Sequence, residues 1–174
     1  MLPRISLITV CYNAENSVAG ALQSVRVQSY RGFEVIIVDG ASKDHTVDVV
    51  NQFNDLPMSV SSEPDKGIYD AMNKGIARAQ GDILFFLNAD DRLFDMKVLE
   101  DVVHVFDTNL DVDLVYGNVV NVFSDGDVFH TNHSHITPRT LLYGSLCHQS
   151  VFAKKSLFSK YGCFNIDFPI CADF

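Results

Sequence analysis

Residues 83–91 read ILFFLNADD, and the same pattern of a short apolar run before a polar turn occurs as ISLITVCYN at 5–13 and FEVIIVDGAS at 33–42. Near-continuous runs of β-branched and aromatic residues are typical of strands buried on both faces of a parallel sheet. In open α/β sheets, ligands bind outside the carboxyl ends of such strands. We therefore expect one crevice lined by the polar residues at the three strand ends, namely Asn13, Asp39, Asp90 and Asp91.

Adjacent acidic side chains at a strand end indicate a metal. Crowded carboxylates repel each other unless a cation lies between them. Oxygen ligands of this kind suit magnesium or manganese. Asp90 and Asp91 are therefore the predicted ligands of a Mn²⁺ or Mg²⁺ cofactor, of the kind that accompanies a diphosphate. The alternative is that the two aspartates cap the helix that follows them.

The bulk composition limits the classes of partner. The chain has 174 residues, enough for one domain, and a formal net charge of −9 without any cluster of Lys or Arg. A nucleic-acid binder normally shows a basic face, so we expect no nucleic-acid partner. The four cysteines form no C-x-x-C pair, and no signal-like segment opens the chain. We expect a cytoplasmic protein, and peripheral contact with the inner face of the plasma membrane remains open.

The order of predicted elements is that of an α/β domain with two lobes, residues 1–91 and residues 92–174. Strands and helices alternate in the first lobe. Its predicted strands are Ile5–Val10, Phe33–Val38, Met58–Ser61 and Ile83–Leu87, and its predicted helices are Ser17–Gln28, Thr46–Phe53 and Ile68–Gln80. Ser17 and Asp44 are the predicted helix caps.

The second lobe shows a mixed pattern. Its predicted helices are Val98–Phe106, Pro138–Tyr143 and Lys155–Lys160, and its predicted strands are Leu114–Tyr116, Val119–Phe123, Val128–Thr131 and Gln149–Ala153. The middle pair of strands should form a hairpin. Because the sequence ends straight after an apolar stretch, at Cys171–Phe174, we expect a chain truncated at its C-terminus.

Four segments, taken in order, resemble family 2 glycosyltransferases with the GT-A fold. They are Thr9–Asn13 (TVCYN), Val38–Asp44 (VDGASKD), Ser62–Gly75 (SEPDKGIYDAMNKG) and Phe86–Asp91 (FLNADD). The third looks like bacterial exopolysaccharide enzymes, such as those that build colanic acid. Weaker matches to later motifs of the family are His148–Phe152 (HQSVF) and Ala172–Phe174 (ADF).

The resemblance implies a fold and a reaction. The implied fold is a Rossmann-like, mostly parallel sheet flanked by helices, with a smaller mixed acceptor-side lobe after residue 91. The implied activity is that of a metal-dependent, inverting glycosyltransferase in cell-surface polysaccharide biosynthesis. Its donor is a nucleotide-diphosphate sugar, with a UDP-sugar favoured, and its acceptor is a saccharide or lipid-linked saccharide.

The resemblance also implies roles for residues on the donor side. Asp39 accepts a hydrogen bond from the nucleobase, and Thr9 and Asn13 line the same pocket. The alternatives are a turn-forming aspartate and ordinary strand-end hydrogen bonds. Asn88 replaces the first acid of the family's Asp-x-Asp motif, so its amide can bind ribose, and which of Asp90 and Asp91 takes the metal stays open.

Three more donor-side residues and one catalytic residue follow from the same comparison. Asp65, Lys66 and Asn73 are expected to reach ribose or phosphate, although Lys66 also fits a solvated surface position. Their spacing of four residues alone predicts an ion pair between Asp70 and Lys74 on the helix expected at Ile68–Gln80. Asp173 is the predicted general base, with a frayed terminal residue as the alternative.

Histidines and rival functions complete the set of expectations. His130, His133 and His135 are close in sequence, but without a cysteine partner they indicate a solvated loop rather than a zinc site. His148 is expected either to face the diphosphate or acceptor, or to be a buried and satisfied histidine. A nucleotidyltransferase should carry glycines and a base after its first strand, which Cys11–Ser17 lacks. A non-catalytic nucleotide-sugar-binding fragment is the other alternative.

Overall fold

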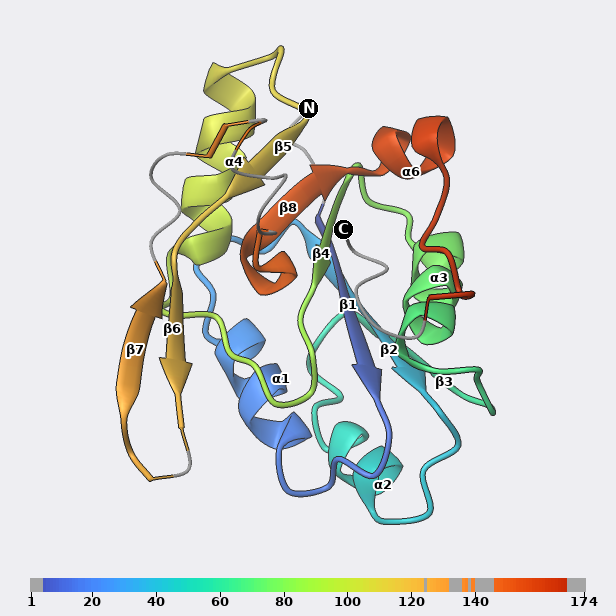
Figure 1. Cartoon of the computed structure of the whole chain (residues 1–174). Helices are drawn as coiled ribbons and strands as arrows, with labels where there is room; N and C mark the ends of the chain where they lie inside the picture. Colours follow the sequence, from blue (N-terminus) through green and yellow to red (C-terminus); the bar gives the residue numbers. More distant parts are fainter. Residues whose placement is uncertain (1–4, 124, 132–135, 138, 140–145, 169–174) are drawn as a thin grey trace.

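A six-stranded sheet runs through the centre of the molecule (Figure 1). The computed structural model describes residues 5–123, 125–131, 136–137, 139 and 146–168. The strand order is β3-β2-β1-β4-β8-β5, in which β1 to β4 run parallel and β8 is antiparallel to both of its neighbours. The strands are β1 (Ile5–Cys11), β2 (Phe33–Asp39), β3 (Met58–Ser62), β4 (Ile83–Phe86), β5 (Leu114–Tyr116) and β8 (Val151–Lys154).

The sequence of the inner strands explains their position. Every residue of β1 and β4 is buried, as is all of β2 except Glu34. Such strands can only lie inside a sheet that is covered on both faces. The chain builds β2 and β3 on one side of β1 and then returns to place β4 on the other side. This reversal puts the ligand-binding end of the sheet at the carboxyl ends of β1 and β4.

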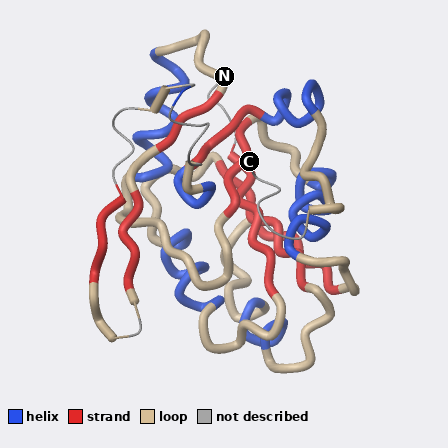
Figure 2. Tube along the Cα trace, in the orientation of Figure 1, coloured by secondary structure: helices blue, strands red, loops and turns tan. Residues whose placement is uncertain are grey.

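Helices cover the two faces of the sheet (Figures 1 and 2). One core cluster contains buried residues of α1 (Val18–Arg26), α2 (Thr46–Val50) and α4 (Val98–Thr108). The other contains buried residues of α3 (Ile68–Arg78), against which α6 (Lys155–Tyr161) adds Phe158. The strands therefore contribute alternate side chains to two cores, as a pleated sheet requires.

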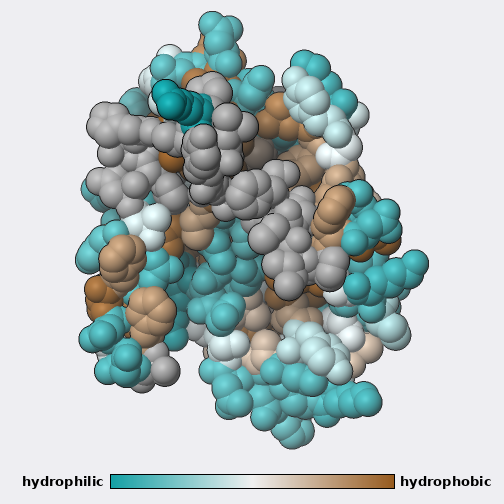
Figure 3. All heavy atoms as spheres, viewed as in Figure 1, coloured by the Kyte–Doolittle hydropathy of each residue, from teal (hydrophilic) through white to brown (hydrophobic). Residues whose placement is uncertain are grey.

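Two features belong to the second lobe. The Phe85 and Phe152 rings stack with centroids 4.0 Å apart, which fixes antiparallel β8 against β4. The hairpin of β6 (Val119–Val122) and β7 (Val128–Thr131) forms a separate two-stranded sheet. Figure 3 shows apolar side chains on this hairpin, where Val122, Phe123, Val128 and Phe129 are exposed.

The predicted α/β class is confirmed, and most elements lie within two residues of their predicted bounds. Three details differ. Ser17 makes no side-chain bond to the start of α1, and α2 ends at Val50 because a turn follows. Strand β8 begins at Val151, because the preceding His148–Ser150 form a short 3₁₀ helix, η1. Apart from Arg139, the helix predicted at 138–143 lies outside the described residues.

The outcome for the helix caps and ion pairs is mixed. The N-cap of α2 is His45 rather than the predicted Asp44 and makes no side-chain cap bond, although the Asp44 Oδ1, one residue earlier, accepts a hydrogen bond of 3.0 Å from the Thr46 N–H. The Asp70 carboxylate lies 3.5 Å from the Lys74 ammonium, as expected for this i,i+4 pair. Within the described residues, no helix combines the length and the apolar character that a membrane crossing needs.

Candidate functional site

The register of the sheet builds a row of polar side chains at the ends of three parallel strands. Cys11 pairs with Asp39, and Asp39 pairs with Ser62, so the three residues lie side by side across β1, β2 and β3. Each of them is the last residue of its strand. Because paired residues share one face of a sheet, their side chains meet.

Asp39 is the centre of this row. Its residue is fully buried, and its carboxylate accepts four hydrogen bonds. Oδ2 accepts from the Ser42 backbone N–H at 3.0 Å and from the Ser62 hydroxyl at 2.6 Å. Oδ1 accepts a short bond from the Ser42 hydroxyl and a long one, 3.7 Å, from the Cys11 thiol. The structure thus shows Asp39 in the turn-forming geometry, with its donors directed at both carboxylate oxygens.

The two loops that follow β1 and β2 are bound to each other. Asn13 donates its backbone N–H to the Ser42 hydroxyl at 2.8 Å, and its side-chain Oδ1 accepts from the Lys43 N–H at 2.9 Å. Glu15 donates its N–H to Asp44, and Ala14 donates to Thr46. Asn13 has a φ of 50° and so occupies the left-handed region. Asparagine tolerates this conformation because its short side chain can hydrogen-bond to the nearby backbone.

Asp65 reaches the same place from β3. A methyl group added to Gly40 would lie 2.6 Å from the Asp65 carboxylate and 3.4 Å from the Tyr12 ring. The bare Gly40 backbone therefore admits both side chains, and 60% of the surface of Tyr12 remains exposed. Asp39, Asp65 and the Tyr12 ring accordingly surround one turn, which brings two predicted donor residues together.

The other two residues predicted in the Ser62–Gly75 segment are differently placed. Lys66 is exposed, and its backbone N–H is bonded to Asp70 at 3.0 Å. The Asn73 amide makes two hydrogen bonds with the Phe164 backbone, at 2.8 and 3.0 Å. In this structure, Asn73 joins α3 to the segment after α6, and its predicted contact with the donor stays a prediction.

A second polar cluster lies at the end of β4. The Asn88 amide nitrogen is 3.4 Å from His148 Nε2, and the Asp91 N–H donates to the Asn88 carbonyl at 3.1 Å. Asn88 Oδ1 and Asp91 Oδ2 are buried, and neither has a hydrogen-bond partner among the described residues. Orphaned buried oxygens of this kind cost free energy, so a bound donor or cation would stabilise them.

Electrostatics at this cluster favour a cation. Burial, and next the charge of Asp90, raise the pKa of Asp91, while Asn88 and then His148 act in the opposite direction. A metal ion would relieve this repulsion, and the available oxygens of Asn88, Asp90 and Asp91 suit Mn²⁺ or Mg²⁺. No group of three His, Cys, Asp or Glu residues in the described part of the chain is arranged to hold a metal alone.

Thr9 and Cys11 lie beneath the site rather than in it. Thr9 shares its face of β1 with Leu7 and Cys11, which belong to the core under α1, and it is fully buried. Its hydroxyl is the third buried polar atom without a partner in the described residues. Burial, and next the charge of Asp39, raise the pKa of the Cys11 thiol to about 12. Cys11 is thus a neutral thiol that supports Asp39.

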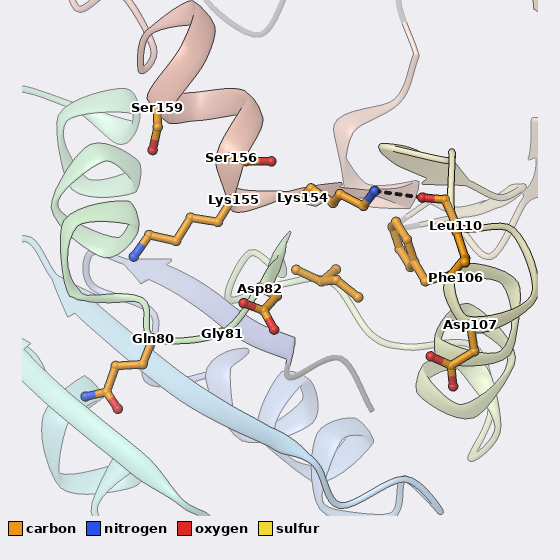
Figure 4. Close-up of a pocket in the computed structure, with 11 residues that line it drawn as sticks. Gln80, Gly81, Asp82, Phe106, Asp107, Leu110, Lys154, Lys155, Ser156 and Ser159 are labelled. Carbon is orange, nitrogen blue, oxygen red and sulfur yellow. Dashed lines mark hydrogen bonds between the residues drawn. The ribbon is translucent and has the colours of Figure 1, made fainter. Parts of the chain in front are cut away.

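A hollow of about 660 Å³ lies at the other end of the sheet (Figure 4). It opens beside Gln80–Asp82, which precede β4, and beside Ile83, the first residue of β4, whereas Asn88 follows β4. Its Lys154 ammonium is paired with Asp113 at 3.0 Å and with the Leu110 carbonyl. The polar strand ends are the better candidate site, because they hold the unpaired buried oxygens and this hollow holds none.

Sequence reasoning missed some members of the site. Ser62 and Tyr12 became evident only from the strand register and from the space above Gly40. His148 was singled out in the sequence without a fixed role, and the structure places it against Asn88. Asp173, together with His133 and His135, lies outside the described residues.

Comparisons with known proteins identify the family of the chain. Residues 6–166 match the model of the family described as "Glycosyl transferase family 2". A "PGL/p-HBAD biosynthesis glycosyltransferase" of Mycobacterium bovis (strain BCG / Pasteur 1173P2) is 33% identical over 179 residues, which cover 98% of this chain and 67% of that protein.

Solved structures show the same fold. The crystal structure of S. aureus TarS 1-349 in complex with UDP-GlcNAc matches with a TM-score of 0.77 at 22% identity, over 91% of this chain and 47% of that one. The mannosyltransferase PcManGT from Pyrobaculum calidifontis, in complex with GDP-Man and Mn²⁺, matches with a TM-score of 0.75 at 22% identity, over 96% and 49%. The chain therefore spans about half of these solved chains.

Proposed function

Because the chain belongs to glycosyl transferase family 2, we propose that it binds a nucleotide-diphosphate sugar at the carboxyl ends of β1, β2 and β4 and transfers the sugar to an acceptor hydroxyl with inversion. The observation that carries the proposal is the pairing of two polar clusters at one end of the sheet. Asp39, Asp65 and Tyr12 form one, and Asn88, Asp91 and His148 form the other. The nucleotide complexes of TarS and PcManGT support this choice of ligand.

Each cluster suits one part of the donor. Asp39 can accept a hydrogen bond from a base N–H, such as that of uracil, and the exposed Tyr12 ring offers a flat apolar surface beside it. We assign Asp65, whose carboxylate lies beside Gly40, to accept from a ribose hydroxyl. We assign Asn88, which has one buried oxygen without a partner among the described residues, to the diphosphate side of the donor. We favour UDP as the nucleotide, because uracil offers an N–H that Asp39 can accept.

Asp90 and Asp91 would hold the Mn²⁺ or Mg²⁺ ion. When bound, such an ion neutralises charge on the leaving diphosphate. The acceptor hydroxyl needs a base within hydrogen-bond reach, and we propose Asp173 for that role. Acceptors in the proposed reaction are saccharides or lipid-linked saccharides, and the pathway is cell-surface polysaccharide biosynthesis, with the enzyme in the cytoplasm at the inner face of the membrane.

A nucleotide panel tests the proposal. UDP, GDP and dTDP are each added to the protein with Mn²⁺ and with EDTA, and the unfolding temperature is measured. A ligand that binds the native state raises this temperature by mass action. We expect the largest rise for UDP with Mn²⁺. No rise with any nucleotide would contradict the proposal, whereas a rise without metal-stimulated hydrolysis of UDP-sugars would indicate a non-catalytic binder.

A further inference from the structure

The turn that carries the proposed metal ligands, Asn88–Asp91, is tied to the sheet at its start. The Leu87 N–H donates to the Ile8 carbonyl at 3.0 Å, directly before the turn. Within the turn, the Asp91 N–H donates to the Asn88 carbonyl, a bond that links the turn to itself. The position of the Asp91 carboxylate therefore also depends on what fixes the chain after the turn.

The chain after the turn is received by the Ser24 side chain of α1, which it passes on its way to α4 (Figure 1). The Leu93 N–H, two residues beyond Asp91, donates to the Ser24 hydroxyl at 3.1 Å. Among the described residues, this is the hydrogen bond that joins the backbone of 88–94 to another element. The Ser24 hydroxyl donates in turn to the Ala21 carbonyl at 2.7 Å, which fixes its orientation. Leu93 is buried, so an unpaired N–H at this position would cost free energy.

The chain from residue 95 onward is held independently of Ser24. Gln28 is fully buried, and its side-chain amide donates to the Asp95 carbonyl and accepts from the Leu99 N–H at 3.1 Å. Loss of the Ser24 hydroxyl would therefore leave the start of α4 in place. The freedom gained would be confined to the turn and the short stretch that follows it, which contains the Asp91 carboxylate.

We propose, on the basis of the proposed nucleotide and metal site, that Ser24 is a positioning residue for Asp91. Its hydroxyl acts through the Leu93 N–H and sets where the Asp91 carboxylate meets the metal. Both hydrogen bonds of the Ser24 hydroxyl are to backbone groups, so this role needs no contact between Ser24 and the metal or nucleotide. A purely structural role would lower stability alone, whereas a positioning role lowers the part of the UDP affinity that Mn²⁺ supplies.

Isothermal calorimetry measures the dissociation constant of UDP with Mn²⁺ and with EDTA, and the ratio of the two constants is the Mn²⁺ gain. Ser24→Ala should reduce this gain by about 2- to 12-fold, the range that corresponds to the net contribution of one hydrogen bond. The dissociation constant in EDTA should not change, because Asp39 and Asp65 follow other strands of the sheet. Unchanged binding in EDTA also shows that the variant is folded.

Two variants serve as controls. Ser29→Ala removes an exposed hydroxyl near the same junction, one that donates to the Glu100 carboxylate of α4 at 2.7 Å, and should leave the Mn²⁺ gain unchanged. Ser24→Thr keeps a hydroxyl that can bond to the carbonyl of the preceding helical turn, as the Ser24 hydroxyl does, and should retain the gain.

The outcomes are distinct. A reduced Mn²⁺ gain in Ser24→Ala, with the gain retained in both controls, supports the assignment. An unchanged gain in Ser24→Ala, or an equal loss in Ser24→Ala and either control, overturns it and leaves the nucleotide site intact. UDP binding without any Mn²⁺ gain in the unsubstituted protein overturns the metal site and the Ser24 role together. Absence of UDP binding by the unsubstituted protein overturns the proposed nucleotide site as well.

Discussion

Asp39 is a carboxylate that no solvent reaches, and its four donors offset the cost of burying it. The sequence allowed its placement at a strand end, since the apolar run before it is unambiguous. The sequence could not show that Ser62, 23 residues later, donates to it, because that contact depends on the register of a parallel pair. Thr9 shows the converse, because a strand-end position did not reveal that its side chain points into the core.

Substitution of Asp39 should affect binding and stability together. Asp39→Ala removes the acceptor for the base and leaves the donors of Ser42 and Ser62 unpaired, so UDP binding should weaken by about 1–3 kcal/mol. Calorimetry measures this, and urea unfolding should show a lower free energy of unfolding. The control is Asp55→Ala, which removes an exposed partner of Arg26 and should cost at most about 1 kcal/mol. Unchanged UDP affinity in Asp39→Ala would remove this residue from the base pocket.

Asp91 should show opposite effects on stability and on metal binding. Asp91→Asn removes a carboxylate whose ionisation is opposed by burial and by Asp90, so the metal-free protein should unfold at a higher temperature at pH 7. The further rise that Mn²⁺ and UDP produce should shrink. Asp90→Asn is the matched control, because Asp90 is exposed and its replacement should change the metal-free stability less.

The pH dependence of metal binding follows from the same raised pKa. The folded protein holds the Asp91 proton more tightly than the unfolded chain does, so the Asp91 contribution to stability decreases as pH rises from the ordinary pKa through the raised one. Mn²⁺ competes with that proton. As the pH is lowered, the affinity for Mn²⁺ should therefore begin to fall at a higher pH than it would at a site of ordinary carboxylates. A Mn²⁺ affinity that is flat over that interval would show that Asp91 is not a ligand.

At the scale of elements, the sequence predicted strands and long helices well, because burial on both faces leaves unmistakable apolar runs. The sequence did not predict the features that depend on contacts between residues far apart in the chain. The 3₁₀ turn at His148–Ser150 packs beside β4, and the Asn73 amide is bonded to Phe164, 91 residues away. Neither partner can be read from local propensity.

Helix α3 packs so closely on β1 that glycine should be more stable than alanine at position 75, the reverse of the usual helix propensity. Alanine favours a helix by about 1 kcal/mol over glycine. A methyl group on Gly75, however, would lie 2.4 Å from Ile8 Cγ2 in the core. Overpacking costs about 1–3 kcal/mol, so Gly75→Ala should lower the free energy of unfolding. Ala77→Gly, at an exposed position of the same helix, measures the propensity alone. Increased stability in Gly75→Ala would mean that α3 moves outward freely.

At the scale of the whole molecule, the net charge of −9 opposes an anionic ligand. In EDTA, added salt screens this repulsion, because the Debye length falls from about 30 Å at 0.01 M to about 3 Å at 1 M. The affinity for UDP without metal should therefore rise between these salt concentrations, opposite to the trend for a basic site. Calorimetry in EDTA at the two salt concentrations tests this. A falling affinity would indicate that local cations such as Lys43 or Lys66 dominate.

The β6–β7 hairpin pairs with no strand of the six-stranded sheet among the described residues. The hydrogen bonds of the hairpin are therefore separate from those that set the strand ends of the central sheet. The length and the side chains of this hairpin can change without disturbing the register that sets Ser62 against Asp39. The hairpin is therefore the part of the described structure whose length and surface can vary most freely around a fixed central sheet.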